Sequence, residues 1–348
     1  MSASRGGWCR PTGEELLEQA QGSGVLISAS RDPDAKLTFV VTSEDTRHGE
    51  RLAVKIPATA AAGEAVDREG RMLVQVRRLG LGPLAATVPR YVESLDVEGR
   101  PVLVSTAVPG TPMSVGYHSW SHTAHPATVR RDFDAAFAWL EAFQASTDRA
   151  GAGADWPGQV LDAVRGRWDG HAALPAAALR LEAARDHLRD AGCATTAVHG
   201  DFWFGNLLLD ETGAVSGVVD WENAAEHGSP LRDTARFVLS YALYLDRHTR
   251  PGHRVLGHRG LRRTGFAPGI EYALCGTGWF PALVRSTLEQ RLARLGVSPR
   301  CWYDVALAGI GEVVASANAD EFGAGHLELL AALPVHARRH RRAGSTPR

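Results

Sequence analysis

The segment AVHGDFWFGNLLLD, residues 197–210, constrains the fold and the function of this chain more than any other stretch of its sequence. His199, Asp201 and Asn206 stand within an apolar run that otherwise has the character of a buried strand. Leaving a charge unpaired in the interior of a protein costs on the order of 3–5 kcal/mol. The segment therefore indicates a binding or catalytic site rather than ordinary core.

The residues that follow predict a β-hairpin at this site. NLLLD and AVSGVVDW are separated by the turn ETG, in which Gly213 supplies the turn conformation. Antiparallel pairing brings Asn206, at the start of the first strand, and Asp220, at the end of the second, to the same end of the hairpin. Asp201 lies on the loop that enters it. Carboxylate and amide oxygens suit Mg²⁺, so we expect Asn206 and Asp220 to be metal ligands.

The same segment has the spacing of a phosphoryl-transfer loop. In the kinase pattern H-x-D-x-x-x-x-N, the aspartate accepts the proton of the acceptor hydroxyl and the asparagine binds magnesium. His199, Asp201 and Asn206 match this spacing, and Asp220 supplies a second metal-binding carboxylate in VVDW. We assign Asp201 the role of base and His199 the role of supporting the loop.

A lysine and a glutamate earlier in the chain complete this pattern. Only two of the 38 basic residues are lysines, Lys36 and Lys55, and Lys55 lies in the apolar strand pattern LAVKIP. Glu69 falls on the apolar stripe of the next helical segment, where an unpaired carboxylate would be costly. We expect Glu69 to pair with Lys55 and to orient its ammonium toward ATP. Glu64 is the competing partner, but it lies outside the stripe.

Lys55, Glu69, HGDFWFGN and VVDWE together resemble the aminoglycoside phosphotransferase and choline kinase-like branch of the protein-kinase-like fold. The resemblance covers residues 24–246 and is most specific at HGDFWFGN and VVDW. It implies that Asp201 is the catalytic base and that Mg²⁺ is bound by Asn206 and Asp220. It also implies ATP as the phosphate donor, and the sequence does not distinguish ATP from GTP.

The resemblance extends to PVLVSTAVPGTPM, which matches the hinge of these enzymes. It implies that the backbone of Ser105, Thr106 and Ala107 hydrogen-bonds adenine. The sequence departs from protein kinases because it lacks a G-x-G-x-x-G loop, D-F-G and A-P-E. About ten residues separate Asp220 from the helix start that GSPLRDTARF, residues 228–237, resembles, which leaves no room for an activation segment. A protein kinase is therefore disfavoured.

The distribution of strand and helix patterns predicts an α+β protein, and the resemblance implies a bilobal, protein-kinase-like fold. Strand patterns at 24–30, 37–44 and 51–57, a helical pattern at 61–80 and two strands within 89–108 describe a small antiparallel N-lobe with one helix. We expect residues 1–106 to form a nucleotide-binding lobe and residues 107–335 a larger, mainly helical catalytic and substrate-binding lobe. The helical patterns lie at 129–147, 176–192, 238–245, 281–296, 304–317 and 326–333. Residues 336–348 form a basic tail that we expect to be disordered.

Composition narrows the class of partner. Hydrophobic residues make up 44% of the chain and charged residues 22%, with a net charge of −1, so nothing favours a nucleic-acid or membrane partner. Four scattered cysteines, the absence of an 18-residue apolar run and an N-terminus unlike a signal peptide favour a cytoplasmic protein. The partner expected is a small molecule with a hydroxyl group. The oligomeric state is not indicated.

The acceptor is left open among aminoglycosides, macrolides, amino alcohols, sugars and homoserine. A polycationic acceptor needs a cluster of carboxylates, and Glu222, Glu226, Asp246 and Glu271 are the candidates. The segment FAPGIEYALCGTGWFP nominates Glu271 and Trp279 for substrate binding, although core packing is the more ordinary fate of a tryptophan. The predicted function is an ATP- and Mg²⁺-dependent O-phosphotransferase. The alternative is a catalytically silent, nucleotide-binding pseudokinase or regulatory module.

Two further patterns are interpreted as structural. GLGPLA, residues 80–85, fits G-x-G-x-x-A but follows a helical pattern and contains Pro83, so it is interpreted as a helix stop rather than a dinucleotide site. His118, His122 and His125 lie in a polar segment without cysteine partners, and we expect a solvated loop rather than a zinc site.

Overall fold

The computed structural model describes residues 24–29, 35–42, 51–97, 99–148, 155–189 and 195–335. The turn at 31–34 and the tail at 336–348 lie outside these residues. The strands are β1 (Gly24–Ala29), β2 (Lys36–Thr42), β3 (Arg51–Pro57), β4 (Tyr91–Val97), β5 (Arg100–Thr106), β6 (Thr111–Pro112), β7 (Thr196–Val198), β8 (Leu207–Leu209), β9 (Val215–Val218) and β10 (Ala225–Gly228). The α-helices are α2 (Ala60–Arg77), α3 (Met113–Tyr117), α4 (Pro126–Thr147), α5 (Trp156–Arg167), α6 (Leu174–Arg189), α7 (Leu231–Leu243), α8 (Pro268–Cys275), α9 (Trp279–Arg294), α10 (Trp302–Ser316) and α11 (Asp320–Ala332). Short 3₁₀ helices are η1 (Gly82–Thr87), η2 (His122–Ala124), η3 (Trp221–Asn223) and η4 (Pro299–Cys301).

The N-terminal part is a five-stranded antiparallel sheet with the order β1-β2-β3-β5-β4. All five strands were expected from their β-branched patterns. Within the sheet Lys55 pairs with Thr38 on one side and with Leu103 on the other, so the lysine lies in the central strand. A central strand is hydrogen-bonded to a neighbouring strand on both edges, so the backbone from which the lysine side chain extends is fixed in place.

Helix α2 packs against this sheet and carries Glu69. Thr59 caps the helix, because its hydroxyl accepts a hydrogen bond from the amide of Ala62 at 3.1 Å. The buried face includes Glu69 together with Leu73 and Val76, as the stripe predicted. The helix ends at Arg77, and Gly80 follows with a φ of 74°. The interpretation of residues 80–85 as a helix stop agrees with this geometry.

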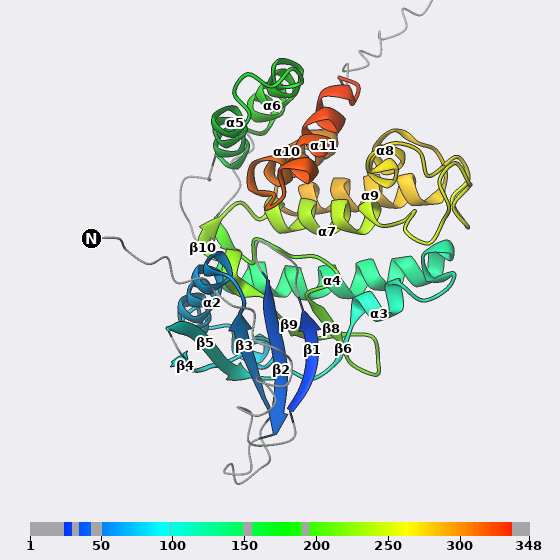
Figure 1. Cartoon of the computed structure of the whole chain (residues 1–348). Coiled ribbons are helices and arrows are strands. Elements are labelled where there is room, and N and C mark those ends of the chain that lie inside the picture. Colours follow the sequence, from blue (N-terminus) through cyan, green and yellow to red (C-terminus); the bar gives the residue numbers. More distant parts are fainter. Residues whose placement is uncertain are drawn as a thin grey trace, which may run out of the picture.

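The rest of the chain is mainly helical. Helix α4 buries the predicted face of Phe133, Phe137, Leu140 and Phe143, and it lies between the sheet and helices α7 and α9 (Figure 1). Helices α5, α6, α10 and α11 form a group farther from the sheet (Figure 1). Each helical pattern found in the sequence overlaps one of these helices, with different ends. Helices α3, α5 and α8 were not predicted.

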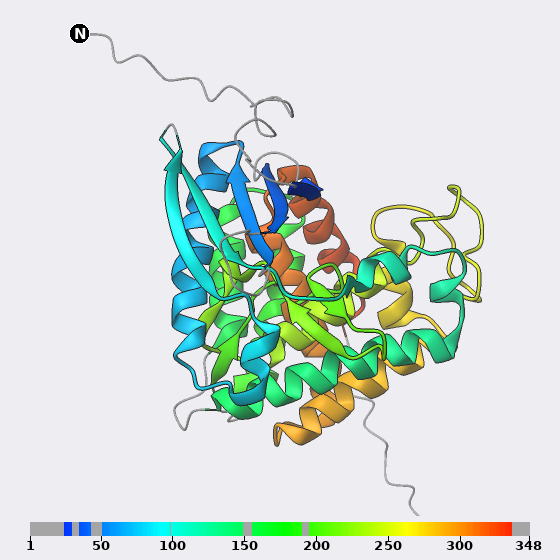
Figure 2. The ribbon, with the colours of Figure 1, turned by 90° about the horizontal axis from the view of Figure 1, so that it is seen from below.

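The short hairpin of β8 and β9 lies between the sheet and α4 in both views of the fold (Figures 1 and 2). Gly213 has a φ of 86° in its turn, as expected for that position. Strands β7 and β10 pair antiparallel beside it. This is the α+β arrangement that the sequence predicted, with a small sheet region followed by a larger helical one. Among the described residues, no helix is long and apolar enough to cross a bilayer.

Candidate active site

The β8–β9 hairpin brings Asn206 and Asp220 to one end. Leu207 pairs with Val218, and the amide of Val219 donates to the carbonyl oxygen of Asn206 at 3.0 Å. Asp220 is therefore the first residue beyond the pairing, next to Asn206. Its φ of 63° and ψ of 63° lie in the left-handed region, which aspartate adopts more readily than most residues. This turn ends the strand and begins η3.

His199 links the Asp201 loop to the strand that leads to Asp220. The amide of Asp201 donates to Nδ1 of His199 at 3.2 Å, so Nε2 carries the proton and donates to the carbonyl oxygen of Val219 at 2.9 Å. The ring is fully buried. This geometry fits the supporting role assigned to His199. Gly200 follows with a φ of 79°, and a Cβ there would overlap the carbonyl oxygen of Asn223.

Asp233 is a site residue that the sequence analysis missed. It lies in the first turn of α7, fully buried, and its two carboxylate oxygens accept the amides of His199 and Gly200 at 2.7 and 2.8 Å. The carboxylate thus clamps the start of the loop that carries Asp201. The signal in the sequence was an acidic residue on the buried face of a helix, the same signal that identified Glu69.

Asp201 is held from two sides. The side-chain amide of Asn206 donates to its carbonyl oxygen at 3.0 Å and to Oδ2 at 3.1 Å. Arg236, from α7, donates to Oδ1 through Nε at 2.8 Å and lies 2.6 Å from it through a terminal nitrogen. Burial alone would lower the pKa of Arg236, but Asp201 raises it overall, so the guanidinium stays charged. The sequence analysis did not single out Arg236.

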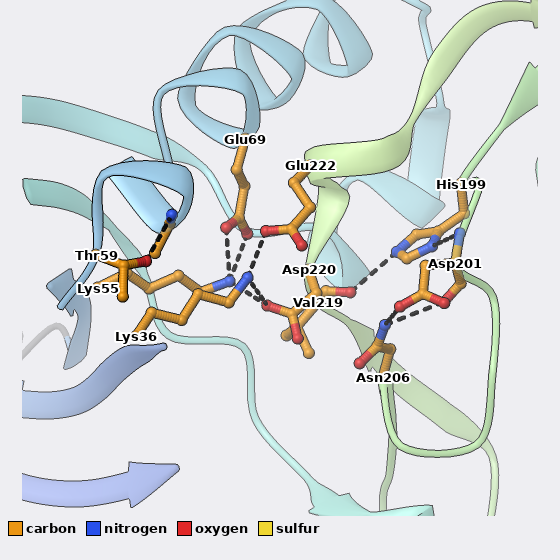
Figure 3. Close-up of polar contacts among 11 residues, drawn as sticks. Lys36, Lys55, Thr59, Glu69, His199, Asp201, Asn206, Val219, Asp220 and Glu222 are labelled. Atoms are coloured by element: carbon orange, nitrogen blue, oxygen red, sulfur yellow. Dashed lines mark hydrogen bonds and ion pairs between the residues drawn. The ribbon is translucent and has the colours of Figure 1, made fainter. Parts of the chain in front are cut away.

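The two lysines of the chain meet in one cluster, which we call the lysine cluster: Lys36, Lys55, Glu69, Asp220 and Glu222 (Figure 3). Lys55 donates to both oxygens of Glu69 at 2.6 and 2.7 Å and also to Asp220. Lys36 donates to Glu222, and its nitrogen lies 4.0 Å from Asp220. The expected contact between Lys55 and Glu69 is present, whereas Lys36 was not expected here.

Opposite charges fix the ionisation states of this cluster. Burial alone would lower the pKa of Lys55, but Asp220 and Glu69 outweigh it and hold the pKa above its usual value. For Asp220, burial would raise the pKa, but Lys55 and Lys36 hold it well below its usual range. Burial raises the pKa of Glu222 despite its contact with Lys36. Both lysines and Asp220 are therefore charged at neutral pH.

The donor set fits a hard divalent cation. The Asn206 amide nitrogen faces Asp201, and in Figure 3 its oxygen points away from Asp201, on the side of Asp220. One carboxylate and one amide oxygen suit Mg²⁺, which keeps water and phosphate as its other ligands. Among the described residues, no three His, Cys, Asp or Glu side chains form a closed metal site. A cation held here would therefore depend on a phosphate ligand.

The amides at the hinge are hydrogen-bonded within the protein. The amide of Thr106 donates to the carbonyl oxygen of Arg90 at 2.9 Å, and the amide of Ala107 donates to that of Arg51 at 2.8 Å. Because the β-sheet bonding continues to the end of β5, both N–H groups are already used. Ser105 also lies within the pairing of β5 with β3 and β4. The binding of adenine by the backbone of Ser105, Thr106 and Ala107 stays a prediction, and in this conformation the amides of Thr106 and Ala107 already have partners within the protein.

The nominated acceptor-binding residues do not gather at Asp201. Glu222 contacts Lys36 in the lysine cluster, and Asp246 forms an ion pair with Arg263 at 3.3 Å. Glu271 is exposed at the start of α8. Trp279 packs against the core, and its indole N–H donates to the carbonyl oxygen of Gly257 at 2.9 Å. The expected carboxylate cluster is absent from these residues because each is bound to, or exposed on, a different part of the fold.

The segment that carries the three histidines near residue 120 is not the solvated loop that was expected. It contains α3 and η2, and His118 and His122 are partly buried. Nε2 of His122 lies 2.7 Å from a carboxylate oxygen of Asp132. His125 is exposed. The polar sequence concealed this packing because its partners come from α4 and α7.

A sheet that presents a glutamate-paired lysine to the end of a hairpin carrying an aspartate and an asparagine defines a phosphotransferase of the protein-kinase-like class. Comparison with known families gives the same class. The chain belongs to the Phosphotransferase enzyme family (APH), whose family model matches residues 34–267. This confirms the resemblance found in the sequence, and the protein is therefore a phosphotransferase.

One of the compared solved structures supports the fold, and two others are similar over most of their length. A candidate aminoglycoside phosphotransferase from Ralstonia eutropha has 16% identity and a TM-score of 0.52, covering 92% of this chain and 95% of that one. A macrolide 2′-phosphotransferase from Brachybacterium faecium has 15% identity, a TM-score of 0.49 and coverages of 93% and 97%. A Plasmodium vivax ethanolamine kinase has 10% identity, a TM-score of 0.49 and coverages of 89% and 80%. A comparison with curated protein sequences finds no match.

Proposed function

We propose that this protein is an ATP- and Mg²⁺-dependent O-phosphotransferase that transfers the γ-phosphoryl group to a hydroxyl of a small molecule in the cytoplasm, where ATP is available. The observation that carries the proposal is the contact of Lys55 with both Glu69 and Asp220. This contact joins the central strand of the sheet to the end of the hairpin at which Asn206 is held against Asp201. ATP is proposed as donor, with GTP as the alternative for the binding assay.

The proposed nucleotide site lies where the two lobes meet. Residues 1–106 form the nucleotide-binding lobe in this proposal, and residues 107–335 form the catalytic and substrate-binding lobe. Lys55 reaches the α- and β-phosphates, and Glu69 fixes the direction of its ammonium. Lys36 adds a second positive charge on the same side of Asp220. Two lysines from neighbouring strands thus supply charge at a place where this sequence has no glycine-rich loop.

The chemistry requires positioning more than covalent work by the protein. The acceptor oxygen forms a bond to the γ-phosphorus while the bond to the β–γ bridging oxygen breaks, and ADP leaves. Asp201 accepts the hydrogen bond of the acceptor hydroxyl and then its proton. Arg236 and Asn206 hold the carboxylate in place for this role. Mg²⁺ bound through Asn206 and Asp220 would neutralise charge on the phosphate oxygens.

An Asp201→Asn variant tests the role of the base. Its kcat should fall by about 10²–10⁴-fold, the usual contribution of a positioned general base. The dissociation constant for ATP·Mg²⁺ should change by less than about twofold, because Asn keeps the size of the side chain and one acceptor oxygen, and the lysine cluster is unaltered. The assay couples ADP release to NADH oxidation with a panel of amino alcohols, aminocyclitols, sugars and simple alcohols.

The matched control is Asp134→Asn, which alters an exposed aspartate on α4. Its kcat should equal that of the unchanged protein. An Asp201→Asn variant that keeps its kcat to within about threefold contradicts the assignment. Binding of ATP·Mg²⁺ without transfer to any member of the panel favours the regulatory module instead.

A further inference from the structure

A cavity of about 150 Å³ opens directly beside Asp201, away from the lysine cluster. Its walls come from the entering loop and from α7, α8, α10 and α11. Asp201 and Arg236 stand at one end, and the remaining lining residues are Trp203, Leu239, Ser240, Leu243, Tyr244, Ile270, Gly309, Ile310, Val313, Phe322 and His326. If Asp201 receives the acceptor hydroxyl, this cavity holds the part of the acceptor next to that hydroxyl.

The lining has no net charge. Its two charged side chains, Asp201 and Arg236, are paired with each other. His326 is buried, its Nδ1 lies 2.9 Å from the carbonyl oxygen of Phe322, and burial lowers its pKa to about 4, so the ring is neutral at pH 7. The hydroxyl of Ser240 donates to the carbonyl oxygen of Phe237 at 3.0 Å. The Asp201–Arg236 pair, Nδ1 of His326 and the Ser240 hydroxyl are therefore occupied within the protein.

This wall disfavours a cationic acceptor. An ammonium group placed in the cavity would meet a single carboxylate, Asp201, which already pairs with Arg236. The other carboxylates considered for a polycation lie elsewhere, with Asp246 paired to Arg263 and Glu271 exposed. A buried charge without a partner is strongly unfavourable.

The size and lining of the cavity instead favour a compact apolar group. A cavity of about 150 Å³ lined by leucine, isoleucine and phenylalanine is large enough to bind benzene. Leu239, Leu243, Ile270, Ile310 and Val313 provide a comparable apolar surface here. A group of about six carbons therefore fits inside the cavity.

We infer that the acceptor is an uncharged alcohol that places a compact apolar group of about six carbons in this cavity and its hydroxyl at Asp201. This inference rests on the proposed function for the reaction itself. The binding preference of the cavity, however, is measurable without any turnover.

The first experiment measures binding of benzyl alcohol and cyclohexylmethanol by ligand-observed NMR and calorimetry. Both should bind saturably to the unchanged protein. Val313→Phe, which fills the cavity, should weaken binding at least tenfold. The matched control is Val115→Phe, at a 60% exposed position on α3, and it should change binding by less than twofold. Absence of saturable binding to the unchanged protein, or equal binding to the two variants, overturns the inference.

Phe322→Ala is a second test of the same cavity, for use where the Val313→Phe variant does not fold. Phe322 is 37% exposed at the edge of the cavity, so its removal should be tolerated. It should shift the preference toward a larger apolar alcohol, such as decahydronaphthalen-2-ylmethanol, by at least fivefold relative to cyclohexylmethanol. If a folded Phe322→Ala variant keeps the preference between these two alcohols that the unchanged protein shows, the assignment of Phe322 to the wall of the acceptor cavity is contradicted.

The second experiment compares turnover of cyclohexylmethanol with that of 4-(aminomethyl)cyclohexylmethanol, which is an ammonium alcohol at pH 7, and with kanamycin. The kcat/KM should be at least tenfold higher for the neutral alcohol. Equal or preferred phosphorylation of the ammonium compounds overturns the inference and leaves the proposed function intact. Saturable alcohol binding with no turnover of any compound sustains the cavity assignment and contradicts the proposed function.

Discussion

Replacing Glu69 with glutamine tests whether the lysine cluster is held by charge. Glu69 is 2% exposed, and both of its oxygens lie within 2.7 Å of the Lys55 ammonium. Glutamine keeps the shape and one acceptor oxygen but removes the charge and turns an amide toward the ammonium. Lys55 would then retain only Asp220 as a charged partner.

The structure sets the expected magnitude. Removing one partner of a buried pair costs about 3–5 kcal/mol when the other charge is left alone. Because Asp220 remains and glutamine still accepts one hydrogen bond, we expect roughly half of this, about 2 kcal/mol of unfolding free energy. Glu64→Gln is the matched control on the same helix. Glu64 is 81% exposed and lies 4.0 Å from Arg68, so its replacement should cost about 0.5 kcal/mol or less.

The assay is urea unfolding followed by tryptophan fluorescence, with both variants measured beside the unchanged protein. The urea midpoint should fall clearly for Glu69→Gln and remain nearly constant for Glu64→Gln. In the coupled assay, Glu69→Gln should also lower kcat/KM for ATP because the Lys55 ammonium loses its orienting partner. A stability difference between the two variants below about 0.5 kcal/mol would refute the reasoning, since it would mean that the buried carboxylate adds nothing beyond an exposed one.

Two other predictions follow from the site and the core. Gly200→Ala should destabilise the protein by about 3 kcal/mol and abolish activity, because it combines left-handed backbone strain with overlap of the Asn223 carbonyl. Its control is Gly213→Ala, which has a φ of 86° but open space around it. This control should cost only about 1 kcal/mol of unfolding free energy in the same urea assay. Burial lowers the pKa of His258 and of His326 to about 4. Since the unfolded chain takes up these protons near pH 6.5, this part of the stability is complete above pH 6.5 and is lost as the pH falls toward 4, by up to about 3 kcal/mol for each ring. An unfolding free energy that stays constant between pH 6.5 and pH 4 would contradict the lowered pKa values of these two histidines.

Those parts of the site that depend on nearby residues were predictable from the sequence. Asn206 and Asp220 are joined by a hairpin whose turn and strands are local, so their placement at one end followed from pairing rules. The contact between Lys55 and Glu69 followed from helical periodicity and the cost of burying a lone carboxylate. The apolar face of α4 followed from the same periodicity.

Contacts between distant segments were not predictable in this way. Arg236 reaches Asp201 across 35 residues, and Lys36 reaches Glu222 across 186, and a single sequence contains no information that pairs such positions. Glu222 was accordingly assigned to the substrate, although its contact is with a lysine. Helix α5 is a different case. A Pro stands at its start, and its apolar residues have helical spacing: Trp156, Val160, Leu161 and Val164. That helix could have been found from its sequence.

The gathering of both lysines in one buried cluster makes the surface of this enzyme unusual as a target for chemical labelling. Every side-chain amine of the chain belongs to Lys36 or Lys55, and both are shielded beside Asp220. Acylating reagents that modify surface amines in most proteins would find only the α-amino group outside this cluster. If the proposed function holds, an acyl-phosphate derivative of ATP would therefore deliver its tag to the proposed nucleotide site with almost no background, and the modified peptide alone would report which lysine lies beside the phosphates.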